Sequence, residues 1–176
     1  MDTERRKGIA LAEKHGLSHA AQAIRDAKCY QDIFNAAINE SSLELVSTIV
    51  AESKDPYWNY YAALYIPGLT EAQKERHLRA LAESKDPYWN YSAAFIPGLT
   101  KAQKERHLRA LAESKDPEWN YSAALYIPGL TKAQKEWHLH ALAESKDPDL
   151  NYSAALRIPG LTKAQKERHL AIAGIA

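Results

Sequence analysis

The chain has 176 residues, and its 45% apolar and 26% charged residues are an ordinary balance for a globular protein, which argues against disorder. Lysine and arginine number 23 against 22 acidic residues, so the net charge of +1 excludes a global attraction to nucleic acid or anionic membranes. The single cysteine, Cys29, excludes an internal disulfide framework. No stretch approaches the roughly 20 apolar residues of a membrane span, and the charged start lacks a signal peptide, so we expect a soluble, cytoplasmic protein.

Residues 1–53 resemble degenerate copies of a helical unit that is clearer further along the chain. Gly16-Leu17-Ser18 stands where the later copies have Gly-Leu-Thr. We predict one hairpin with helices at 2–15 and 18–28, and a second with helices at about 30–38 and 40–53. The charged residues at 2–7 suit a capping unit that faces water.

Residues 54–176 contain four near-identical helix-turn-helix units, which we number repeats one to four. Their histidines mark the period, at steps of 30, 31 and 31 residues: His77, His107, His138 and His169. This spacing lies in the range of solenoid repeats. Repeat two has Phe95 alone where repeats one and three have Leu-Tyr, so its first helix should be one residue shorter.

Local chemistry predicts where both helices of each repeat begin. The first helix starts at an Asp-Pro pair, an N-cap followed by the residue best suited to the first helical position, and it must end before a Pro-Gly corner. The cap aspartates are Asp55, Asp86, Asp116 and Asp147. The second helix starts at a threonine followed three residues later by a glutamine, the pattern of a capping box. These pairs are Thr70 and Gln73, Thr100 and Gln103, Thr131 and Gln134, and Thr162 and Gln165.

The two helices differ in their apolar surfaces. The second helix is amphipathic, with Leu108 and Leu111 of repeat two on one stripe. The first helix is apolar nearly all round, with Trp89 on one side and Tyr91 and Phe95 on another, so it should be covered on two faces. One such hairpin cannot bury these surfaces alone, and the repeats are therefore expected to stack and share a core.

The order of motifs over residues 51–176 is Leu-Ala, polar residues, Asp-Pro, an aromatic residue, small residues and then Pro-x-Leu. This order resembles the units of HEAT-like and leucine-rich-variant α-solenoids. The resemblance implies a right-handed superhelix that binds macromolecules along a groove, so we expect an all-α, right-handed α-solenoid of about six stacked hairpins. There are two departures: the cysteines of iron–sulfur leucine-rich-variant proteins are absent, and an asparagine follows the aromatic residue. These asparagines are Asn59, Asn90, Asn120 and Asn151.

Three recurring side-chain types have alternative interpretations. The histidines lie one repeat apart, which favours interhelical hydrogen bonding over a shared metal ion. The tryptophans and tyrosines of the first helices could form a stacking platform for bases or sugars, but core packing is favoured because these helices must be buried. The asparagines could be buried amides that bond to the adjacent repeat, or a ladder that meets an extended ligand.

Differences between the repeats indicate candidate contacts. They concentrate at helix starts and at outward positions of the second helix, whereas caps, corners and leucines hardly vary. Trp137 stands where the other repeats have arginine, and tryptophan is enriched at the centres of interfaces. The candidate partner-binding residues are Trp137, Arg76, Arg79, Arg106, Arg109, His140, Tyr57 and Tyr88.

No catalytic, metal-binding or cofactor motif is found in the sequence, and residues repeated four times make poor unique sites. We therefore expect a non-catalytic scaffold for another protein, either an adaptor or an inhibitor or immunity-type protein, without contact to membranes. One alternative is a nucleic-acid-binding solenoid that uses lysine and arginine of the second helices, although repeat one has Glu71 where the others have lysine. Another is a structural array that self-associates through exposed terminal repeats, since the chain ends in the apolar run "HLAIAGIA".

Overall fold

The computed structural model describes residues 6, 9–10, 12–14, 16, 18–26, 47, 50–51, 55–66 and 68–175. The described residues form nine helices and no strand, as expected for an all-α protein. The helices are α2 (Ser18–Asp26), α5 (Pro56–Tyr65), α6 (Glu71–Ala82), α7 (Pro87–Ala93), α8 (Lys101–Glu113), α9 (Pro117–Tyr126), α10 (Lys132–Glu144), α11 (Pro148–Arg157) and α12 (Lys163–Ile172). Contacts divide the chain into two compact units, Met1–Leu81 and Ala82–Ala176, which are described separately.

The first unit contains α2, α5 and most of α6. Helix α2 falls inside the helix expected at 18–28, and the described residues of the segments expected at 2–15 and 40–53 include helical ones, such as Ser47 and Val50. The helix expected at 30–38 lies outside the described residues. Buried Val50, Ala62 and Ile66 form a small core, against which Trp58 packs. Repeat one therefore shares its core with the segment that precedes it in the chain.

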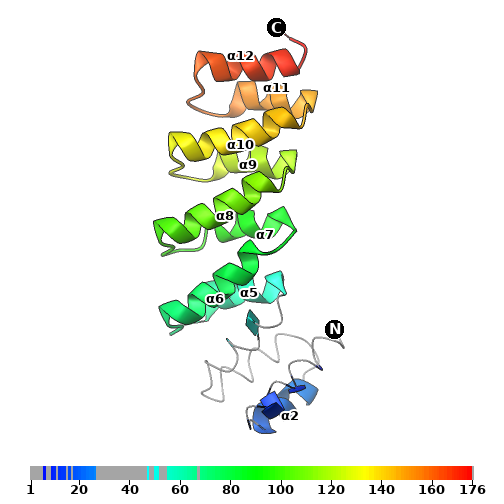
Figure 1. The fold of residues 1–176 in the computed structure, drawn as a ribbon, viewed down its shortest axis with the longest axis vertical. Coiled ribbons are helices and arrows are strands. Elements are labelled where there is room, and N and C mark those ends of the chain that lie inside the picture. The colour runs from blue at the N-terminus through cyan, green and yellow to red at the C-terminus, as the bar shows by residue number, and fades with distance from the viewer. Residues whose placement is uncertain are drawn as a thin grey trace. The chain divides into compact units, whose positions relative to one another are not determined.

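The second unit contains repeats two, three and four as the hairpins α7–α8, α9–α10 and α11–α12 (Figure 1). Each first helix contacts the first helix of the next repeat, and each second helix contacts the next second helix. The unit thus has a first-helix layer of α7, α9 and α11, and a second-helix layer of α8, α10 and α12. These neighbour contacts are those of a helical repeat.

The predicted N-caps are confirmed. Each cap aspartate accepts a hydrogen bond through its side chain from a main-chain N–H of the first turn, as in the 2.9 Å bond from Tyr57 N to Asp55. In repeat three, Thr131 accepts from the N–H of Gln134 while the Gln134 side chain accepts from the N–H of Thr131. The same reciprocal pair is present in repeats one, two and four. Side chains therefore satisfy N–H groups that a helix start leaves without intrahelical partners.

Helix α7 is shorter than predicted, with 7 residues against 10 in α5, α9 and α11. The residues after it form tight i to i+3 hydrogen bonds, from Phe95 N to Ser92 O and from Ile96 N to Ala93 O. Because the turn is tighter, repeat two can lose one residue and still bury Ile96, as repeat three buries Ile127. The deletion expected to shorten the helix by one residue therefore reshapes its whole last turn.

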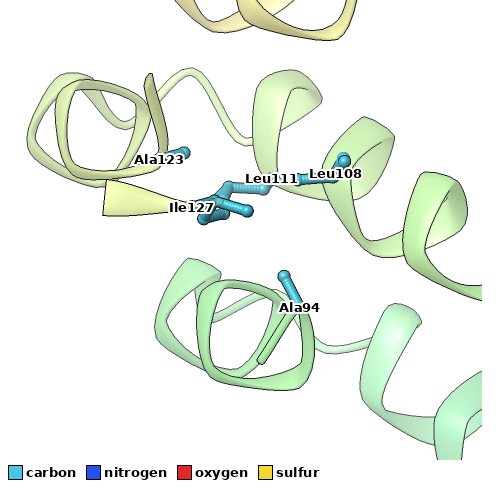
Figure 2. Packing of buried hydrophobic residues seen from close by; sticks show 5 residues of the cluster. All are labelled: Ala94, Leu108, Leu111, Ala123 and Ile127. Atoms are coloured by element: carbon cyan, nitrogen blue, oxygen red, sulfur yellow. The ribbon is translucent and has the colours of Figure 1, made fainter. Parts of the chain in front are cut away.

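The core of the second unit lies between hairpins. Figure 2 shows Leu108 and Leu111 of α8 meeting Ala123 and Ile127, with Ala94 of repeat two completing the cluster. A second cluster joins α9, α10 and the next hairpin through Ala124, Leu139, Leu142, Ala154 and Ile158. Within this unit the prediction that repeats share a core is confirmed.

The prediction that the first helix is covered on two faces accounts for only part of its aromatic surface. Trp119 and Tyr91 pack against the core, as expected. The last turn of the helix is open to solvent, with the final residue Tyr126 of α9 61% exposed and the penultimate residue Leu156 of α11 56% exposed. Helical periodicity assigns every apolar residue to the core, whereas the neighbouring helices leave this edge uncovered. Among the described residues, no helix is long and apolar enough to cross a membrane.

Candidate functional site

The repeated histidines and asparagines form a buried hydrogen-bonded pair in every repeat. Nδ1 of His138 lies 2.8 Å from Oδ1 of Asn120, and the corresponding distances in the other three repeats are 2.8, 2.9 and 2.5 Å. All eight side chains are at most 1% exposed. The prediction of interhelical hydrogen bonding is confirmed. In the described part of the chain, no group of three or more histidine, cysteine or acidic residues could hold a metal ion.

The asparagine also links successive repeats. Nδ2 of Asn120 donates to the main-chain oxygen of Asp116 and, at 3.3 Å, to that of Leu111 in the preceding repeat. Asn151 bonds to Leu142 in the same way. Of the two interpretations of the asparagine, the buried amide bonded to the adjacent repeat is therefore the correct one.

This geometry fixes the histidine tautomer. Because Nδ2 of Asn120 donates twice, its Oδ1 is the acceptor, and Nδ1 of His138 must carry the proton that it donates. Burial lowers the pKa of His138 from 6.5 to about 4. Burial, together with the charge of Arg76, lowers the pKa of His77 to about 4 as well. The rings are therefore neutral at pH 7, with the lone pair on Nε2.

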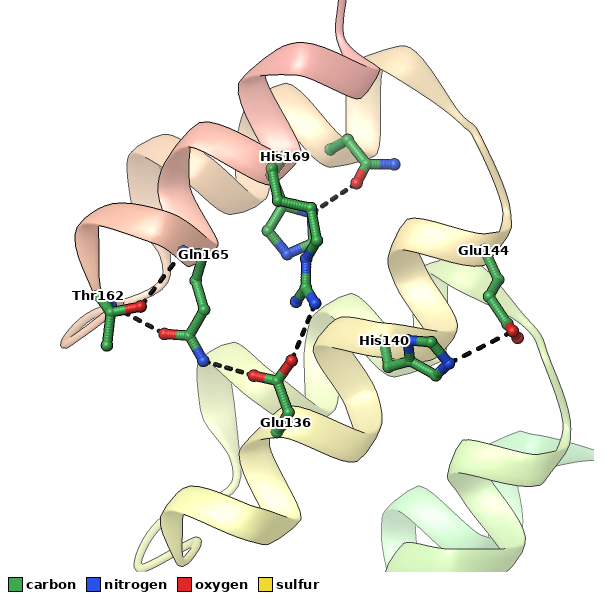
Figure 3. A network of polar contacts seen from close by, with 8 residues as sticks. Glu136, His140, Glu144, Thr162, Gln165 and His169 are labelled. Carbon is green, nitrogen blue, oxygen red and sulfur yellow. Dashed lines mark hydrogen bonds and ion pairs between the residues drawn. The ribbon is translucent and has the colours of Figure 1, made fainter.

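Polar side chains on the second-helix layer also join repeats. Glu136 of α10 accepts hydrogen bonds from Gln165 and Arg168 of repeat four (Figure 3). Burial alone would raise the pKa of Glu136, but the bonds from Gln165 and Arg168 and the nearby positive charges lower it overall. Two lysines bridge repeats through their ammonium groups, Lys104 to Pro128 O and Lys135 to Pro159 O, each at 2.9 Å. Part of the basic surface expected on these helices, namely Lys104, Lys135 and Arg168, is thus engaged within the protein.

The second-helix layer carries an open surface groove of about 340 Å³ between α8 and α10. Its lining is mostly apolar, with charged groups among the residues: Arg109, Ala112, Glu113, Lys115, Trp137, His140, Ala141 and Glu144. Three candidate residues, Trp137, Arg109 and His140, meet here. The groove is therefore the best candidate site in the described residues.

Trp137 is less exposed than its position predicts. The Arg109 guanidinium lies 4.9 Å from the centre of the Trp137 ring, in a cation–π contact. Arg109 also pairs with Glu105 at 2.7 Å, and the tryptophan side chain is half-buried. An arginine of repeat two thus covers one part of the tryptophan of repeat three. The ring is held in place rather than left free in solvent.

The other end of the groove is charged. His140 lies 3.4 Å from Glu144, and both side chains are exposed (Figure 3). Glu113 occupies the position equivalent to Glu144 one repeat earlier, and Lys115 follows it in the loop. Ala112, Ala141 and the two glutamates were not among the predicted site residues. They recur unchanged in repeats one to three, so comparison of those repeats offered no signal for them.

The other candidate residues lie elsewhere. Arg106 is half-buried on α8, and Tyr88 is 43% exposed in the first-helix layer, where its ring meets Trp119 at 5.4 Å. The remaining three belong to the first unit: Tyr57, Arg76 and Arg79. The Tyr57 ring packs at a tilt against that of Tyr61, while Arg79 pairs with Glu75 at 2.8 Å.

Comparison of the chain with protein-family models, with curated proteins and with solved structures finds no match. What defines its class is therefore its own architecture, an all-α helical repeat in which buried polar pairs and shared apolar clusters join neighbouring hairpins. The likeness to HEAT-like and leucine-rich-variant repeats remains a resemblance of pattern.

Proposed function

We propose that the protein is a non-catalytic binding scaffold for another protein, and that the groove between α8 and α10 is its contact site. The supporting observation is that Trp137, Arg109 and His140, which occupy positions that vary between repeats, line one open and largely apolar groove. A held aromatic ring loses little side-chain entropy when a partner packs on it, which is a property of interface hot spots.

The charges around the groove favour a protein partner over nucleic acid. Arg109 is paired with Glu105, and the groove also contains Glu113 and Glu144. Tracking of a phosphate backbone needs a continuous stripe of available positive charge. A partner with an apolar anchor and polar groups of both signs matches this surface better.

The test replaces Trp137 with the residue that the other three repeats carry. Trp137→Arg should fold, because Arg106 and Arg168 are accommodated at the equivalent positions. Immobilised wild-type protein, Trp137→Arg and a control variant, Tyr126→Ser on the first-helix layer, are each used to capture proteins from the native host, with quantification by mass spectrometry. A partner held by wild type and control should bind the Trp137 variant roughly thirtyfold more weakly, as for a hot spot of about 2 kcal/mol. Equal capture by all three would refute the groove as the site.

The salt dependence of binding distinguishes a protein partner from the alternative, a nucleic-acid partner. A complex that resists nuclease and has a shallow dependence on salt supports the protein-binding proposal. A steep log–log salt slope that is lost in Arg106→Ala plus Arg109→Ala, but kept in Trp137→Ala, would replace it with nucleic-acid binding.

A second candidate function, self-association, is favoured by the last hairpin. Tyr152 is 42%, Leu156 56% and Ile175 58% exposed, whereas the repeat-three equivalents Tyr121 and Leu125 pack against the next core cluster. Light scattering over a range of concentrations should then show mass growth that Leu156→Glu abolishes. A constant monomer mass at high concentration would exclude this function.

The proposal includes the finer architecture that the resemblance implies, a right-handed superhelix of about six hairpins, and a cytoplasmic location that suits the single cysteine Cys29. An experimental structure of the full chain tests the former. Fractionation of the native host tests the latter.

A further inference from the structure

The histidine–asparagine pairs leave one ring nitrogen unused in two repeats. Nε2 of His138 and Nε2 of His169 are buried and meet no hydrogen-bond partner among the described residues. Nδ1 of each ring is already committed to its asparagine, Asn120 or Asn151. A neutral ring tolerates this, because an imidazole lone pair is a modest acceptor.

In repeat one, by contrast, Nε2 of the histidine has a hydrogen-bond partner. Nε2 of His77 lies 2.9 Å from the hydroxyl of Ser47, which stands 30 residues earlier in the chain. A hydroxyl can donate to the lone pair of a neutral ring, and it can turn to accept from a protonated one. At the position one repeat before His138, the chain has His107 instead of a serine.

We propose that the buried histidines make the stacking of α9–α10 and α11–α12 an acid-sensitive latch, in which a proton added to His138 or His169 separates neighbouring repeats of the second unit. The proton can only go to Nε2, because Nδ1 already carries one. The added proton turns Nε2 into a charged N–H donor. This donor is buried, because both histidine side chains are 0% exposed, and it has no acceptor among the described residues. Such a group is costly until it reaches water.

The hydrogen-bond chain explains why the opening would occur between repeats. His138 on α10 holds Asn120 on α9, and Asn120 holds the carbonyl of Leu111 on α8. If the His138 ring turns toward water, Oδ1 of Asn120 loses the N–H that it accepts from. Asn120 is then held less firmly, and its bond to the preceding hairpin weakens. His169, Asn151 and Leu142 form the same chain one repeat later.

Charged groups around the two rings do not stabilise a proton equally. At His138 burial is the cause that lowers the pKa. At His169 burial and Arg168 lower the pKa, whereas Glu136 of α10 opposes them. His107 and His169 flank His138 at equivalent positions, so a positive charge on one ring disfavours a charge on the next.

The direction of the effect follows from linkage. A histidine whose pKa is lower in the folded than in the unfolded state contributes stability that is complete above the unfolded value of 6.5 and is lost as the pH falls toward the folded value, about 4 for His138. The pKa of Glu136 is lowered from 4.5, so the contribution of this carboxylate is lost as the pH falls below 4.5. Opening between pH 6.5 and 4.5 therefore reports on the buried histidines rather than on Glu136.

The test is an acid titration of the full chain, followed by far-UV circular dichroism and tryptophan fluorescence from about pH 8 to about pH 3. The double variant His138→Gln, His169→Gln keeps an N–H donor for the asparagines but cannot be protonated. Wild type should open between pH 6.5 and 4, and the midpoint of the double variant should lie at lower pH, because the contribution of His77 remains in this range while those of His138 and His169 are gone. The exposed His140→Gln serves as the matched control and should open with wild type. Equal midpoints for the double variant and wild type would overturn the proposal.

A second measurement applies if the double variant does not fold at neutral pH. Nitrogen-15 shifts of the wild-type imidazoles should show His138 and His169 as neutral Nδ1–H tautomers down to the opening transition. A reversible titration of either ring near pH 6.5, with the protein still folded, would likewise overturn the latch.

Discussion

At the scale of single residues, buried polar side chains set how repeats join. Asn120 makes three hydrogen bonds to three different segments, namely His138 of its own repeat, the start of its own helix and Leu111 of the preceding repeat. An apolar side chain of similar size could fill the same space but would leave a ring N–H and two carbonyls without this partner. The amide thus adds directional specificity to contacts that are otherwise apolar.

Replacement of Asn120 with alanine should therefore destabilise the protein by about 2–4 kcal/mol, because it removes a whole set of buried bonds at once. Ser122→Ala, on the same helix at a position that varies between repeats, should cost about 0.5 kcal/mol or less. Urea unfolding followed by circular dichroism measures both. Similar costs for the two variants would contradict the role assigned to the amide.

Backbone conformation at the loop lysines permits a matched comparison. Lys146 adopts a φ of 57° in the left-handed region, which favours glycine, whereas Lys85 in the equivalent loop does not adopt a positive φ. Lys146→Gly should therefore be neutral or stabilising by up to about 1 kcal/mol, and Lys85→Gly should be destabilising by about 0.5–1 kcal/mol. Thermal unfolding of both variants gives the order. If Lys146→Gly were instead the more destabilising variant, the backbone of the two loops would not differ in solution as the φ angles indicate, with a positive φ at Lys146 alone of the two.

At the scale of helices, local signals determine where each element begins. The Asp-Pro and Thr-x-x-Gln motifs supply N-caps at every predicted start, and their hydrogen bonds are formed in all four repeats. These motifs act over three residues, so they were readable from the sequence. The end of α7 was not, because the tight turn there depends on where Ile96 must be buried.

Removal of one capping hydroxyl tests how much an N-cap stabilises the start of its helix. Thr131→Ala should destabilise the protein by about 1 kcal/mol, since the N–H of Gln134 loses its acceptor. Thr131→Ser keeps the hydroxyl and should retain most of the stability. Chemical denaturation of the two variants compares them, and an equal loss would mean that the methyl group, not the cap, matters at this position.

At the scale of the whole molecule, the apolar clusters of the second unit belong to pairs of hairpins. Leu108 and Leu111 of one hairpin are buried with Ala123 and Ile127 of the next. A hairpin taken alone would expose these side chains to water, and short isolated helices are marginal in water. Stability in this unit is therefore a property of neighbours rather than of one repeat.

An excised peptide of residues 116–145, one hairpin, should accordingly have little helix in dilute solution. A fragment of residues 82–176 should be helical and should melt cooperatively, because it keeps both shared clusters. Circular dichroism at equal residue concentration compares the two. Cooperative melting of the single hairpin would contradict the account of how the repeats bury their apolar surface.

The sequence by itself determined the repeat, the helix starts and the burial of the leucines and histidines, because each depends on spacings of a few residues along one helix. Only the tertiary structure decided that Arg109 covers Trp137, that alanines common to repeats one to three line the groove beside them, and that Tyr126 and Leu156 remain open to solvent. Arg109 and Trp137 belong to different hairpins, and their separation is set by how those hairpins pack. The candidate site is formed by this packing, so comparison of the repeats could indicate its variable residues but not their grouping.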